Sequence, residues 1–132
     1  MPSVFSRIVA REIPAHILRE DSQFLAFLDV RPIRDGHSLV IPKTEISDLF
    51  DLPDPLLSGL MCFAKPVAKA IQEVTQAARV GVAVVGLEVP HAHIHLVPID
   101  DIHDLDFRRA RPAEHDRLAA MAARIRAALA IQ

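Results

Sequence analysis

The hydrophobic positions of this chain gather in five short segments separated by turn residues or prolines, a pattern that predicts β-strands. The expected strands cover residues 16–20, 24–30, 37–42, 79–85 and 91–98. Asp21 and Ser22 predict a tight turn between the first two strands, which makes them a hairpin. Pro42 should end the third strand, because proline has no N–H to donate to a neighbouring strand.

Three other segments repeat their hydrophobic residues every three or four positions, which predicts helices. The longest is expected from Asp54 to about residue 78, with Asp54 as N-cap and Pro55 in the first helical position. A short helix is expected over residues 3–11, and a C-terminal helix opens at Pro112. Helices combined with strands joined by tight turns predict an α+β fold with an antiparallel sheet.

Length and composition predict one domain, over residues 1–132, that needs no disulfide. The 132 residues are 51% hydrophobic and 24% charged, with a formal net charge of -2, which gives no general attraction to nucleic acid. No apolar run approaches the ~20 residues of a membrane span, and Cys62 is the single cysteine. We therefore expect a soluble, cytoplasmic protein with no nucleic-acid or membrane partner.

Seven histidines and only four glycines narrow the chemistry further. Phosphate-binding loops of the Walker and dinucleotide types need several glycines within a few residues, and here the glycines are scattered. Three of the histidines, His91, His93 and His95, alternate with apolar residues. Because strand residues two apart lie ~6.6–7 Å apart on the same side, we expect the three imidazoles to share one face of a strand.

This histidine row is compatible with two kinds of chemistry. A neutral imidazole can act as a nucleophile or move a proton near pH 7, and a row of them can meet an anionic group at several points. Histidines two apart on a strand are also a usual way to present ligands to zinc, and a third could complete an open catalytic metal site. The spacing of the triplet alone leaves both interpretations open.

The stretch HAHIHLV, from His91 to Val97, resembles the signature of the histidine-triad family of nucleotide hydrolases and transferases. Three ordered blocks carry the resemblance from Val4 to Pro98: VFSRIVAREIPAHI, FLAFLDVRPIRDGHSLVIPK and LEVPHAHIHLVP. It implies an α+β fold with a five-stranded antiparallel sheet, a long central helix and a C-terminal helix. It also implies a homodimer, a nucleoside phosphate bound beside the histidine strand, and no metal or other cofactor in the chemistry.

The resemblance also implies roles for particular histidines. His93 matches the nucleophile that attacks the α-phosphorus and forms a nucleotidyl-histidine intermediate. His91 and His95 match its flanking members, which contact phosphate oxygens and assist proton movement. His37 matches a fourth histidine that supports the triad from the neighbouring strand.

Further positions match the nucleotide pocket of the family. Asp29 matches the acidic residue that accepts hydrogen bonds from the ribose hydroxyls. Five apolar residues match the walls of the base pocket in the family: Phe5, Ile8, Ile13, Phe27 and Val30. The implied substrate is a conjugate of a purine nucleoside monophosphate, such as a 5′-phosphoramidate.

Two positions depart from the family pattern. Ser3 and Ser6 stand where many relatives carry paired cysteines of a zinc site, so we expect no structural zinc. The loop at residues 84–90 is short and lacks the usual Asn, and Glu88 stands where a neutral donor is expected. An ionised carboxylate repels a phosphate, so Glu88 either points away or recognises an amine leaving group. The resemblance therefore favours a hydrolase acting through His93, with a nucleotide-binding protein of weak turnover and a three-histidine metal enzyme as the alternatives.

Overall fold

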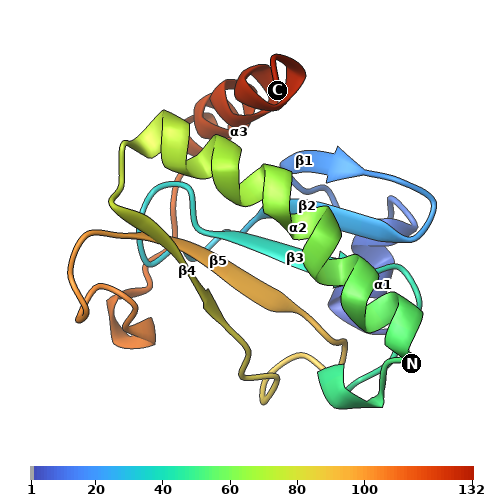
Figure 1. Ribbon diagram of the computed structural model, residues 1–132. Helices are drawn as coiled ribbons and strands as arrows, with labels where there is room; N and C mark the ends of the chain where they lie inside the picture. The colour runs from blue at the N-terminus through green and yellow to red at the C-terminus, as the bar shows by residue number, and fades with distance from the viewer. Residues whose placement is uncertain (1) are drawn as a thin grey trace.

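The computed structural model describes residues 2–132 and is built on a five-stranded antiparallel sheet (Figure 1). Its strands are β1 (Ile17–Glu20), β2 (Phe24–Leu28), β3 (Ser38–Pro42), β4 (Arg79–Ala83) and β5 (Ile94–Ile99). They lie in the order β1-β2-β3-β5-β4, and all neighbours pair antiparallel. The predicted α+β fold, its antiparallel sheet and its first hairpin are confirmed.

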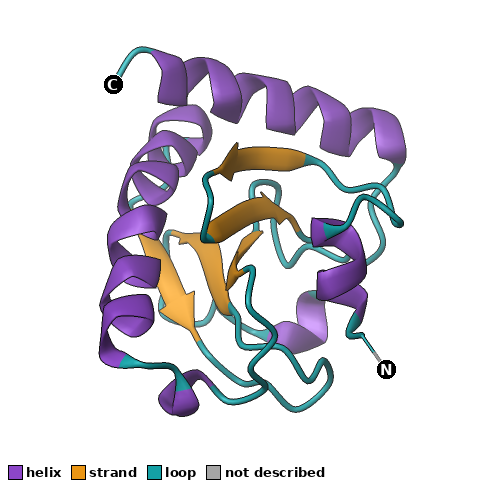
Figure 2. Ribbon diagram, turned by 90° about the vertical axis from the view of Figure 1, so that its right-hand side faces the viewer, coloured by secondary structure: helices purple, strands orange, loops and turns teal. Residues whose placement is uncertain are grey.

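Helices cover both faces of this sheet (Figure 2). They are α1 (Val4–Val9), α2 (Asp54–Thr75) and α3 (His115–Ala130), with short 3-10 turns η1 (Leu49–Asp51) and η2 (Phe107–Arg109). The larger core joins α2 and α3 to one face of the sheet, and a smaller core joins α1 to the other. The described helices include none that is both long and apolar enough to cross a membrane.

Strand β2 shows why the two cores form. Ala26 and Leu28 belong to the larger core, whereas Leu25 and Phe27 belong to the smaller one. Alternate side chains of a strand point to opposite faces, and here both faces are covered, so every residue of the strand is buried. The apolar run in the sequence therefore reflects a central strand between two helical layers.

Several predicted boundaries are wrong by a few residues. Asp54 is the first residue of α2 and not its N-cap, which is Pro53, and the helix ends at Thr75 because Gln76 adopts a left-handed conformation (φ 58°). The C-terminal helix begins at His115 and not at Pro112. The backbone N–H groups of residues 111 and 113 instead donate to the carbonyls of residues 32 and 30, in the loop after β2.

The last strand begins three residues later than predicted, at Ile94. The backbone N–H of Ala92 donates to the carbonyl of Ile46, at 2.7 Å, so this part of the chain has left the ladder with β3. As a result His91 and His93 precede the strand and only His95 lies on it. The expectation that all three imidazoles project from one regular strand is thus wrong.

Candidate active site

A cavity of about 580 Å³ opens between α1, the ends of β2 and β3, and the loop at residues 84–90. Residues predicted for the site gather on its wall: Phe5, Ile8, Ile13, Phe27, Asp29, Val30, His37, Glu88, His93 and His95. His91 is the one predicted site residue that does not line it. The cavity is mostly apolar toward α1 and polar where the histidines lie, a combination typical of small-molecule sites.

His93 presents one unoccupied ring nitrogen. Its Nδ1 lies 2.7 Å from the carbonyl oxygen of His91. A carbonyl can only accept a hydrogen bond, so Nδ1 carries the proton and Nε2 keeps its lone pair in the neutral ring. The ring of Phe5 contacts His93 edge-on, with 5.1 Å between centroids, and His93 is 6% exposed. In the neutral ring, this geometry leaves Nε2 available to a molecule in the cavity.

His37 and His95 form a hydrogen-bonded pair with a defined order of protons. The backbone N–H of Ile33 donates to Nδ1 of His37, at 3.0 Å, so the proton of His37 is on Nε2. That Nε2–H donates to Nδ1 of His95, at 2.9 Å, which leaves the proton of His95 on its own Nε2. His95 therefore offers an N–H donor beside the bare nitrogen of His93.

Burial keeps this pair neutral. Burial lowers the pKa of His37 to about 4, and burial together with the neighbouring histidines lowers the pKa of His95 to about 4. Both rings also use their unprotonated nitrogen as an acceptor, so an added proton would break a hydrogen bond. At neutral pH the pair acts as an aligned series of N–H donors.

The local chain explains how His37 reaches this position. Gly36 adopts a positive φ of 99°, which favours glycine, and so reverses the chain immediately before β3. The carbonyl of His37 then accepts the backbone N–H of Asp29, at 3.0 Å, joining the end of β2 to the beginning of β3. On β5, His95 is paired with Leu39 of β3 and so projects into the smaller core.

The ring of His91 does not reach the cavity. It is fully buried, its Nε2 lies 2.7 Å from the carbonyl oxygen of Pro42, and its Nδ1 lies 2.8 Å from Oγ of Ser3. Burial lowers its pKa. Since both nitrogens are engaged within the protein, this geometry does not form the expected contact with phosphate oxygens. The part of His91 that meets the site is its carbonyl group.

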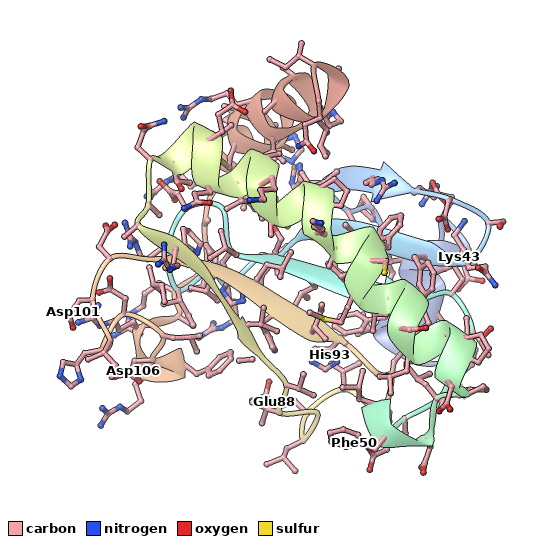
Figure 3. All side chains as sticks on the ribbon, in the orientation of Figure 1. Lys43, Phe50, Glu88, His93, Asp101 and Asp106 are labelled. Carbon is pink, nitrogen blue, oxygen red and sulfur yellow. The ribbon has the colours of Figure 1, made fainter. Side chains whose placement is uncertain are left out.

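Asp29 and Glu88 bring carboxylates to the cavity at different depths. Oδ1 of Asp29 accepts the backbone N–H of Arg31, at 2.9 Å, and Oδ2 lies 3.6 Å from Nε2 of His37. Burial raises the pKa of Asp29. Glu88 is exposed at the rim, on the loop next to His93 (Figure 3). The short loop therefore leaves Glu88 on the cavity wall.

Within residues 2–132, one group of side chains has the composition of a metal site, formed by Asp29, His37 and His95. Its two ring nitrogens are only 2.9 Å apart and share a proton. Two imidazoles on tetrahedral zinc, at Zn–N distances of about 2.0–2.1 Å, would hold their nitrogens roughly 3.3 Å apart. The three histidines of the HAHIHLV stretch do not form such a group. This arrangement favours hydrogen-bond chemistry over a catalytic metal.

Three residues near the triad carried no signal in the sequence. Phe107 of η2 contacts His95 edge-on, with 4.8 Å between centroids. Arg31 lines the cavity. Glu45 contacts Ser3 and Ser6 at the first histidine. Hydrophobic spacing could not have identified these polar or isolated residues, and the family resemblance implied no role for them.

Comparison with known proteins assigns the family. The model of the HIT domain matches residues 10–102. Adenosine 5′-monophosphoramidase HNT1 of Saccharomyces cerevisiae is 37% identical over 99 residues, which are 74% of this chain but only 63% of the yeast protein. A zinc-bound histidine triad family protein of Mycobacterium smegmatis has a TM-score of 0.83 at 35% identity, covering 97% of this chain and 93% of that one. A Hit-like protein of Bartonella henselae has a TM-score of 0.85 at 28% identity, covering 96% and 95%. This chain belongs to the HIT domain family of histidine triad proteins.

Proposed function

We propose that this protein hydrolyses nucleoside 5′-phosphoramidates or related nucleoside phosphate conjugates through a nucleotidyl-His93 intermediate. The observation that carries this proposal is the hydrogen bond from Nδ1 of His93 to the carbonyl of His91, which leaves Nε2 bare beside the cavity. The similarity to an adenosine 5′-monophosphoramidase supports the choice of substrate class. The match spans less than two thirds of that yeast protein, so the activity is carried over as a proposal.

The lining of the cavity favours one orientation of a bound nucleotide, with the base at the apolar wall and the phosphate at the histidines. Phe5, Ile8 and Phe27 form an apolar wall for the base, and Val30 extends it at the more exposed edge. Asp29 can accept hydrogen bonds from the ribose hydroxyls, because its Oδ2 has no hydrogen-bond donor among the described residues. A volume of about 580 Å³ is within the usual range for small-molecule sites. This orientation brings the α-phosphate to the histidines.

The first chemical step follows from the tautomers. Nε2 of His93 attacks the α-phosphorus and the new P–N bond forms, while the bond to the leaving group breaks and its electron pair stays on the leaving group, which takes up a proton from solvent. The imidazole then carries a positive charge, which the carbonyl of His91 stabilises through Nδ1–H. The Nε2–H of His95 can donate to a non-bridging phosphate oxygen, where negative charge has to be stabilised.

Water completes the reaction. Its oxygen attacks the same phosphorus and gives up one proton to solvent, while the P–Nε2 bond breaks and its electron pair returns to His93. The products are a nucleoside 5′-monophosphate and the free enzyme.

A second candidate function is nucleotide binding with weak turnover. It is favoured by Glu88, which adds a carboxylate at the cavity rim where a phosphate and its leaving group must fit. The carboxylate of Glu88 repels a phosphate, but it would attract a leaving group that is a protonated amine. The nature of the leaving group therefore separates the two candidates.

One experiment tests both candidates and the metal-enzyme interpretation. Metal-stripped protein is incubated with purine nucleoside phosphoramidates and dinucleoside polyphosphates, and the wild type is compared with His93→Ala. Turnover that survives chelation and disappears in His93→Ala supports the hydrolase. Nucleotide binding without turnover favours the second function, and turnover restored only by zinc would contradict both. The homodimer and the cytoplasmic location implied by the resemblance also remain proposals, and sedimentation of the purified protein tests the first.

A further inference from the structure

A network of hydrogen bonds surrounds His91 at the side away from the cavity. Oγ of Ser3 lies 2.8 Å and Oγ of Ser6 lies 3.3 Å from Nδ1 of His91. The hydroxyl of Ser6 donates to Oε1 of Glu45 at 2.7 Å, and the backbone N–H of Ser3 donates to the same oxygen. These two serines and Glu45 are called the serine clamp below.

The direction of each hydrogen bond in the clamp can be assigned. The carbonyl of Pro42 only accepts, so Nε2 of His91 carries the proton and Nδ1 is an acceptor. The hydroxyl of Ser3 must then donate to Nδ1, while its oxygen accepts the backbone N–H of Ser6, at 3.0 Å. The hydrogen bonds from Ser3 and Ser6 hold the pKa of Glu45 well below its ordinary value, so its carboxylate remains an acceptor.

The clamp does not fit a zinc ion. Ser3 and Ser6 stand at the positions where the family resemblance places paired cysteines, but a hydroxyl is not among the sulfur, imidazole and carboxylate ligands that zinc prefers. The hydroxyl protons and the lone pair of Nδ1 are already paired with one another or with Glu45. In this chain a closed hydrogen-bond network fills the place in which a metal would need free ligands.

The clamp is connected to the reacting histidine by two routes. The first is the backbone, because the residue whose ring the clamp holds also supplies the carbonyl that accepts Nδ1–H of His93. The second is α1, because Ser3 is its N-cap and α1 carries Phe5, whose ring contacts both His91 and His93. A displaced His91 would therefore alter both the tautomer of His93 and the wall of the cavity.

We propose that Ser3, Ser6 and Glu45 are positioning residues, forming a metal-free clamp that orients His91 and thereby holds His93 as the Nδ1–H tautomer. Fixing this ring matters because catalytic groups act efficiently only when held in the reacting geometry, and small displacements can cost roughly a hundredfold in rate. The effect on turnover rests on the proposed hydrolase function, whereas the effect on the tautomer does not.

The test compares Glu45→Ala with Glu45→Gln, since Glu45 is exposed and its replacement leaves the cores intact. Glutamine keeps an oxygen that can accept both hydrogen bonds, whereas alanine removes it. We expect Glu45→Ala to lower kcat by roughly tenfold or more with little change in KM, and Glu45→Gln to retain most of the wild-type kcat. Ser3→Ala should show the same loss of kcat. Ser3→Thr, which keeps the hydroxyl, should retain most of the wild-type kcat.

A second readout uses the histidine side chains directly. In a ¹⁵N–¹H correlation spectrum, wild-type His93 should show a protonated Nδ1 and a bare Nε2, and Ser3→Ala and Glu45→Ala should shift His93 to a mixture of tautomers. Unchanged His93 signals and unchanged kcat in both variants would overturn the proposal. Stoichiometric zinc that is retained by the purified wild type and lost in Ser3→Ala would overturn it as well. If the wild type shows no turnover, the proposed function fails, and the spectra still decide whether the clamp orients His93.

Discussion

Acidification should destabilise this protein through two histidines that the fold keeps neutral. His37 and His95 have pKa values lowered to about 4, against 6.5 for an unperturbed imidazole. The unfolded chain therefore takes up protons near pH 6.5, whereas the native protein resists them until about pH 4. The free energy of unfolding is therefore highest above pH 6.5 and falls as the pH decreases toward 4.

The size of the effect follows from these pKa values. At pH 5 an unfolded imidazole is almost fully protonated, while one with a native pKa of about 4 is roughly one-tenth protonated. Linkage then makes each histidine destabilising by about 2 kcal/mol between pH 7 and pH 5, and the pair by about 4 kcal/mol. Buried His91 contributes in the same direction. This window also lies above the ordinary pKa values of carboxyl groups, which limits their contribution.

Urea unfolding at pH 7 and at pH 5 measures this loss. The most informative variant is His95→Gln, because the oxygen of glutamine can still accept the hydrogen bond from Nε2 of His37. It should lose about 2 kcal/mol less than the wild type between the two pH values. His103→Gln replaces an exposed histidine and is the matched control. Its free energy of unfolding should change between pH 7 and pH 5 by as much as that of the wild type. Equal pH dependence in the wild type and His95→Gln would refute the reasoning that His95 is held neutral by burial.

Three other predictions concern the cavity and the end of α2. Glu88→Gln should change the preference among leaving groups more than the affinity for the nucleotide, which kcat/KM over a substrate panel measures; an equal loss for every leaving group would contradict this role. Asp29→Asn should raise KM for ribonucleotide substrates by roughly tenfold, as expected for a lost charge-assisted hydrogen bond, and should affect 2′-deoxy analogues less; the same change for both sugars would place the ribose elsewhere. Gln76→Gly should stabilise the protein by about 1 kcal/mol in urea unfolding, because Gln76 has a φ of 58° that costs a side-chain-bearing residue roughly this much; an unchanged or lower stability would show that its side-chain hydrogen bond to Glu73 matters more.

Much of the fold could be predicted from the pattern of apolar residues. That pattern reports which side chains must leave water, so it identified the five strands and the three helices. It could not locate helix and strand ends, because these depend on hydrogen-bond partners distant in sequence. The carbonyl of Ile46, which draws the chain at Ala92 out of the ladder, is such a partner.

The candidate site divides in the same way. The histidine motif and its ordered blocks identified His93, His95, His37 and Asp29, and the structure brings these residues to one cavity. The place of His91 was decided only by tertiary structure, because its burial and its bonds to Ser3 and Pro42 join segments that are far apart in the chain. The sequence by itself determined which imidazoles are present and how they alternate. Only the folded arrangement of donors and acceptors decided which ring nitrogen carries each proton, and this decides which histidine can act as a nucleophile.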